Sequence, residues 1–130
     1  MVAAARKLRA VDLNAYKVLH VAGLALLLLG LGGVLLTPKE AEKGRLPGML
    51  HGIGLLLMAV AGFGAMAKSH IAAPDTWPVW LILKMVAWLF LAALPALVRA
   101  GTVPRGAGWI VAAVLAASAA WLAIVKPAFG

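Results

Sequence analysis

The stretch VWLILKMVAWLFLAALPALV, Val79 to Val98, decides the structural class of this protein. Its only ionisable side chain is Lys84, and the rest of the stretch is almost wholly apolar. A helix of about 20 apolar residues crosses a hydrocarbon core of about 30 Å. The stretch therefore predicts a membrane-spanning helix. Lys84, about 7–8 Å inside its first end at about 1.5 Å per residue, requires an explanation.

The composition of the whole chain extends this prediction. Of the 130 residues, 65% are hydrophobic and 12% are charged, and the mean hydropathy is +1.03. Soluble domains are only about 45–50% apolar. Four apolar runs are long enough to span a bilayer, namely residues 18–36, 48–67, 79–98 and 109–125. We expect an integral membrane protein.

The segments between the apolar runs are short, polar and rich in proline and glycine: TPKEAEKGRLP, KSHIAAPDTWP and VRAGTVPRGAG. Such segments form tight connections between antiparallel neighbours. They predict an all-α fold, a four-helix up-and-down bundle with short loops. Residues 1–130 would form a single transmembrane domain with a basic N-terminal flank at residues 1–17. We do not interpret the flank as a secretory signal, because the apolar run behind it is too long and lacks a small-x-small cleavage pattern.

The net charge of +8 does not indicate a nucleic-acid-binding protein. Nucleic acid requires one basic stripe with interleaved aromatics, whereas these cations flank both ends of the spans. Anionic lipid headgroups are the expected partners. One end of the bundle would carry Arg6, Lys7, Arg9, Lys17, Lys68 and Lys126, and the other Lys39, Lys43, Arg45, Arg99 and Arg105. The cluster before the first span favours a multi-pass protein with both termini in the cytoplasm.

Small residues recur along the first two spans. Gly23, Gly30 and Gly33 lie in the first, and Gly48 and Gly52 form a GxxxG motif in the second. Small residues allow helices to approach closely in lipid. These glycines predict close packing, and the glycine-rich faces offer contacts for a homo-oligomer or a larger membrane complex.

Intramembrane chemistry is restricted to three ionisable residues, His20, His51 and Lys84, because no Asp or Glu lies within a span. The lack of an embedded carboxylate argues against proton-coupled export of cations and against hydrolysis by paired carboxylates. The chain has no cysteine, which excludes thiol chemistry and thiolate metal sites. No catalytic residue is assigned.

Alternating helix directions place His20 and Lys84 toward the same side of the membrane, where they can meet. Tyr16, His20 and Gly23 share one helix face at i, i+4 and i+7. His51 starts from the opposite side, so we expect it to be separated from His20 by much of the membrane thickness. The rival interpretations are a snorkelling Lys84, a His20 that only bonds a neighbouring helix, and a satisfied interfacial His51.

Three features suggest a family. YKVLH opens the first helix, a lysine lies early in the third, and LPGMLHG opens the second. Together with four compact spans, they resemble the bacterial four-helix membrane group that includes the haem-containing protoporphyrinogen oxidase and the SirB-type proteins. This resemblance implies that His20 binds b-type haem and that Lys84 is functional.

Three hypotheses follow. In the first, the protein binds haem b or another porphyrin, with His20 as the metal ligand, Lys84 paired with a propionate and Tyr16 beside the cofactor. In the second, it is a non-enzymatic accessory or scaffold subunit, or a lipid-binding bundle. In the third, oligomerisation forms a small channel or transporter.

Overall fold

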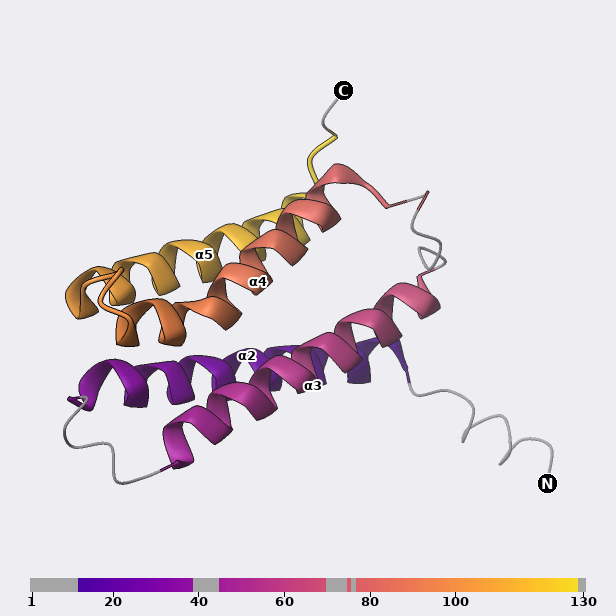
Figure 1. The fold of residues 1–130 in the computed structure, drawn as a ribbon. Helices are drawn as coiled ribbons and strands as arrows, with labels where there is room; N and C mark the ends of the chain where they lie inside the picture. The colour runs from indigo at the N-terminus through magenta and orange to yellow at the C-terminus, as the bar shows by residue number, and fades with distance from the viewer. Residues whose placement is uncertain (1–11, 39–44, 70–74, 76, 129–130) are drawn as a thin grey trace, which may run out of the picture.

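The chain folds into four long helices, described here from a computed structural model that covers residues 12–38, 45–69, 75 and 77–128. They are α2 (Leu13–Leu36), α3 (Leu46–Lys68), α4 (Val79–Arg99) and α5 (Arg105–Val125). No strand occurs in the described ranges. The helices alternate in direction (Figure 1), and the prediction of an all-helical four-helix arrangement is confirmed. Residues 1–11 of the basic flank, Lys39, Lys43 and His70 lie outside the described residues.

The helices are longer than the apolar runs that predicted them. α2 begins at Leu13 rather than at residue 18, and α5 begins at Arg105 rather than at residue 109. Each added turn is a mixed polar and apolar segment that hydropathy alone does not assign to a span. The residues just before these two helices, Asp12 and Pro104, have non-helical backbone with ψ values of 145° and 144°. α2 and α5 therefore begin directly after them.

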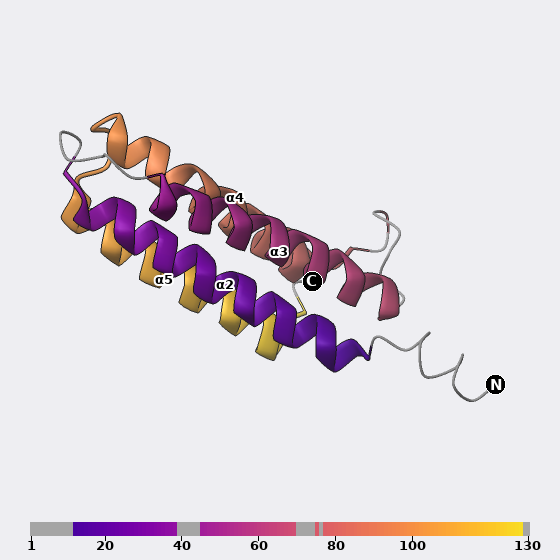
Figure 2. The same cartoon turned by 90° about the horizontal axis from the view of Figure 1, so that it is seen from below.

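The four helices form two hairpins. α2 packs mainly on α3, and α4 packs mainly on α5, whereas fewer contacts join one hairpin to the other. Figures 1 and 2 show the two pairs lying side by side, with the beginning of α2 and the end of α5 toward one end of the bundle. This end, where α2 and α4 begin and α3 and α5 finish, is called the terminal end below. The opposite end, which carries Thr37, Arg45, Arg99 and Arg105, is called the loop end.

The core that joins the hairpins lies in the half of the bundle near the loop end. It consists of Leu27, Leu31, Leu35, Met58, Leu91, Leu94, Val98 and Ala112. The residues contributed by α2 and α4 all come from the second half of each helix. In Figure 1 the hairpins diverge toward the terminal end. The hairpins are therefore held together most firmly away from the chain termini.

The outer surface of the bundle is apolar. Large hydrophobic side chains remain exposed on every helix, including Leu29 at 63%, Leu56 at 66%, Phe90 at 56% and Ile124 at 81%. All four helices are long and apolar enough to cross a membrane. An exposed apolar surface of this extent is unfavourable in water and suited to hydrocarbon.

Glycines determine how closely α2 and α3 approach. A Cβ atom at Gly23 would lie 2.8 Å from the backbone nitrogen of Met58, and one at Gly54 would lie 2.6 Å from the backbone oxygen of Gly23. The backbones are thus in direct contact, as in other small-residue helix pairs in lipid.

The GxxxG motif does not take part in this contact, contrary to the expectation. A Cβ atom at Gly48 or Gly52 would meet nothing within 4 Å. The reason is the helical period of 3.6 residues, because Pro47, His51 and Gly54 form the face of α3 that packs on α2. Gly48 and Gly52 are rotated away from that face and lie on the exposed outer side.

Candidate functional site

His20 crosses the α2–α3 contact. Its Nδ1 lies 2.9 Å from the backbone oxygen of Met58 on α3. A carbonyl oxygen only accepts hydrogen bonds, so Nδ1 carries the hydrogen and donates. The neutral ring then keeps a lone pair on Nε2, and this atom is buried without a hydrogen-bond partner among the described residues. Fixing one ring nitrogen on a carbonyl while the other stays available is the arrangement used by histidines that bind metals.

His51 makes the reciprocal bond from α3 to α2. Its Nδ1 donates to the backbone oxygen of Leu27 over 3.1 Å, and its Nε2 is also buried without a partner in the described part of the chain. The side chain is 5% exposed. His51 is therefore satisfied at Nδ1 but not at Nε2, and its position relative to a membrane surface stays a prediction.

The expected separation of the two histidines is also too large. Leu27, which accepts the bond from His51, lies seven residues after His20 on α2, or about 10 Å along the axis. The prediction took each histidine to lie near its own membrane surface. The residues that accept their bonds, Met58 and Leu27, instead lie near the middle of α3 and α2. At about 10 Å they are still too far apart to share one metal ion, because each nitrogen ligand must come within about 2.1 Å of it.

A short repeat explains this reciprocity and was missed in the sequence. α2 contains LHVAGLAL at residues 19–26 and α3 contains LHGIGLLL at residues 50–57, which share the pattern Leu-His-x-x-Gly-Leu-x-Leu. In both copies the histidine donates to the facing helix, and the glycine three residues later contacts the facing backbone. The α2–α3 contact thus has approximate local two-fold symmetry, and comparison of the two spans with each other could have revealed it.

Lys84 and His20 lie at the same end of the bundle. Lys84 is half-buried, and its charge acts on the imidazole of His20. Lys126, just after α5, acts in turn on Lys84, and its Nζ lies 5.7 Å from the centre of the Trp80 ring. Lys84 is therefore an electrostatic neighbour of both His20 and Lys126 at the terminal end. Among the described residues no carboxylate pairs with Lys84, so the charge of Lys84 is available to an anion.

Two aromatic side chains complete the neighbourhood. Tyr16 lies across Gly64 of α3, in space that a side chain at position 64 would need. Trp88 follows Lys84 by one helical turn and has a buried Nε1 without a hydrogen-bond partner in the described ranges. Tyr16 thus belongs to the α2–α3 packing, whereas Trp88 offers an unused donor near the contact between the hairpins.

The histidine and lysine side chains described above fit a haem better than they fit a bare metal ion. Within the described ranges no cluster of three or more His or acidic side chains could hold a bare metal ion. A haem requires less of the protein, because the porphyrin supplies four ligands and a single histidine can supply the fifth. His20 offers the required neutral imidazole, and Lys84 offers a cation for a propionate.

Comparison with protein-family models, curated proteins and solved structures finds no match to this chain.

Proposed function

We propose that this chain is a four-span membrane protein that binds b-type haem or a related porphyrin between its hairpins at the terminal end. The observation that carries the proposal is the lone pair on His20 Nε2, which is buried and fixed in place by the bond from Nδ1 to the oxygen of Met58. A buried polar atom without a partner is unfavourable by about 1–3 kcal/mol, so its persistence favours a ligand that occupies it.

In this proposal His20 would ligate the iron and Lys84 would pair with a propionate. Trp88 Nε1 is available to donate to a second polar group of the ligand, and Tyr16 closes the α2–α3 side of the site. Bound haem would supply one-electron redox chemistry. The protein's own contribution is to hold the imidazole neutral and oriented and to compensate the negative charge of the ligand.

The membrane location rests on the exposed apolar surface and on four helices of spanning length. We propose that both termini face the cytoplasm, because Lys17, Lys68 and Lys126 lie at the terminal end. A bacterial inner membrane is what the resemblance to the bacterial four-helix group implies. The ligand site would then lie toward the cytoplasmic half of the bilayer.

An absorption spectrum tests the proposal. The protein is expressed with haem supplied, purified in mild detergent and measured from 350 to 650 nm, oxidised and then reduced with dithionite. A Soret band that shifts on reduction and is lost in His20→Ala supports haem binding. A colourless protein, or a band that persists in His20→Ala, contradicts it.

A pair of variants then tests the shared site. Haem affinity is measured for His20→Ala, Lys84→Met and the double variant, with Lys17→Met as a control because Lys17 is exposed at the same end. Two residues that contact one ligand give non-additive losses, whereas independent residues give additive ones. Equal affinities for Lys84→Met and Lys17→Met would remove Lys84 from the site.

A second candidate function is a non-enzymatic subunit that assembles through α3. The observation in its favour is the exposed GxxxG pair, Gly48 and Gly52, with open space beside both. Energy transfer between labelled copies in vesicles measures such assembly. Gly52→Ile should reduce it, whereas Gly106→Ile, at another open glycine, should not. Equal transfer in both variants contradicts assembly through this face.

A further inference from the structure

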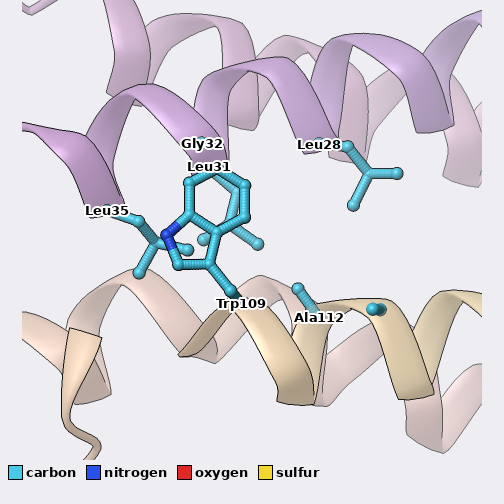
Figure 3. Close-up of a pocket in the computed structure, with 7 residues that line it drawn as sticks. Leu28, Leu31, Gly32, Leu35, Trp109 and Ala112 are labelled. Carbon is cyan, nitrogen blue, oxygen red and sulfur yellow. The ribbon is translucent and has the colours of Figure 1, made fainter. Parts of the chain in front are cut away.

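An apolar groove separates α2 from α5 at the loop end, away from the proposed haem site. Figure 3 shows Trp109 rising from α5 against α2, with Leu31 and Gly32 behind the ring. Leu28 and Ala113 complete the lining toward the middle of the bundle. The space between these side chains has a volume of about 210 Å³ and is partly open to the outside.

Hydrocarbon is the occupant that this lining favours. The groove is lined by the side chains of leucine, alanine and tryptophan together with Gly32, so it offers little to hold a water molecule. Apolar cavities stay dry, and one of about 150 Å³ accepts benzene. This groove is larger and can take several methylene groups. An unfilled groove would also lose the dispersion contacts that its lining makes with a guest.

A fixed cation stands at the end of the groove. Arg105 Nη1 donates to the backbone oxygen of Thr37 over 2.7 Å, which ties the first residue of α5 to the end of α2. Thr37 lies two residues after Leu35 and Arg105 one turn before Trp109, and both Leu35 and Trp109 line the groove. A guanidinium group has five N–H donors, so one bond to Thr37 leaves capacity for an oxyanion.

The surroundings of Arg105 carry the same sign of charge. Arg45 lies just before α3 and Arg99 is the last residue of α4, so with Arg105 three arginines lie at the loop end. The described carboxylates, Asp12 and Asp75, are both at the terminal end. The 39–44 segment, outside the described residues, adds two lysines and two glutamates, which cancel.

We propose that this groove is a binding site for one anionic phospholipid, with an acyl chain between α2 and α5 under Trp109 and the phosphate on Arg105. The apolar lining lies toward the middle of the bundle and Arg105 lies at its end. A phospholipid has the same arrangement, with its acyl chain inside the bilayer and its phosphate at the surface. Basic pockets between membrane helices bind anionic lipids in this way. The proposal depends on the membrane location but not on a porphyrin at His20.

Quenching of tryptophan fluorescence by brominated lipid tests the site. The protein is reconstituted in phosphatidylcholine vesicles, and phosphatidylglycerol brominated on one acyl chain is titrated in. The same titration with brominated phosphatidylcholine is the reference. The signal of Trp109 is obtained by subtracting the result for Trp109→Phe. We expect phosphatidylglycerol to be preferred at Trp109.

The charge and the groove are tested by separate variants. Arg105→Gln should lower the preference for phosphatidylglycerol about fivefold, since one basic residue near the surface contributes about 1 kcal/mol. Arg45→Gln removes the same charge at the same end but away from the groove, and it should lower the preference clearly less than Arg105→Gln does. Ala113→Leu fills the groove and should abolish the quenching of Trp109 by both lipids. Ala120→Leu, exposed elsewhere on α5, should not.

Three results would overturn the proposal. Equal quenching by the two lipids in the unmodified protein would show only nonspecific lipid contact. Unchanged quenching in Ala113→Leu would place the lipid outside the groove. Preferential quenching by a brominated fatty acid, with none by phosphatidylglycerol, would mean that a free carboxylate rather than a phospholipid binds there.

Discussion

Replacing Gly54 by alanine should destabilise the bundle by forcing α2 and α3 apart. A Cβ atom at this position would lie 2.6 Å from the backbone oxygen of Gly23 and would also meet the backbone of Leu27, whereas ordinary contacts begin at 3.4 Å. Because these are atoms of a rigid helix and the contact with the Leu27 nitrogen is the shortest, relief requires the helices to separate by about 1 Å. Overpacking of this kind is unfavourable by about 1–3 kcal/mol.

The separation would also lengthen the bond from His51 to Leu27, which lies at the same point of contact. The free energy of unfolding is measured by titrating folded protein in mild detergent with a denaturing detergent. Gly52→Ala is the matched control, because the added methyl group meets nothing within 4 Å and alanine favours helix by up to about 1 kcal/mol. Equal stability of the two variants would refute the direct backbone contact of α2 and α3.

Three further substitutions test other contacts by the same unfolding titration. His51→Leu should change the free energy of unfolding by less than about 1 kcal/mol, because loss of the bond to Leu27 is offset by removal of the unpaired Nε2. A loss of about 3 kcal/mol or more would show that Nε2 has a partner. Arg105→Ala should lower the free energy of unfolding by about 1.5–3 kcal/mol, because the bond to Thr37 at the end of α2 is lost. Arg45→Ala, at an exposed site, should change it by less than about 0.5 kcal/mol. Equal losses in the two variants would contradict the stabilising role of the Arg105–Thr37 bond. Gly32→Ala should change the free energy of unfolding by less than about 1 kcal/mol, since its Cβ would meet only the edge of the Trp109 ring at 3.2 Å. A loss as large as that of Gly54→Ala would show that the two glycines do not differ in how closely they are packed.

Hydropathy was sufficient to predict the four helices because each apolar run has the length of a span. It did not predict the added turn at Leu13 or at Arg105, since mixed polar segments outside a span carry no hydropathy signal. The alternating directions followed from the short loops. They correctly placed His20 and Lys84 at the same end, although a shared ligand stays a prediction.

The details of the α2–α3 contact could not be predicted from spacing alone. The choice between Gly52 and Gly54 as the contact residue depends on the rotation of α3 about its axis, and two residues differ by about 200° in that rotation. The position of His51 depends on how far the two helices overlap. The groove beneath Trp109 arises from side chains of two helices distant in sequence, so no single motif marks it.

The repeated Leu-His-x-x-Gly-Leu-x-Leu segment has a consequence for how the protein enters a membrane. Turning a two-fold related pair of helices end over end places nearly the same contacts at the same depth, so the α2–α3 pair itself gives no preference for either insertion. Only flanking charge can then select the orientation, and the two ends carry six and five basic residues. If the bundle spans a membrane as proposed, a small difference in flanking charge sets its orientation, and moving one or two lysines between its flanks should invert it.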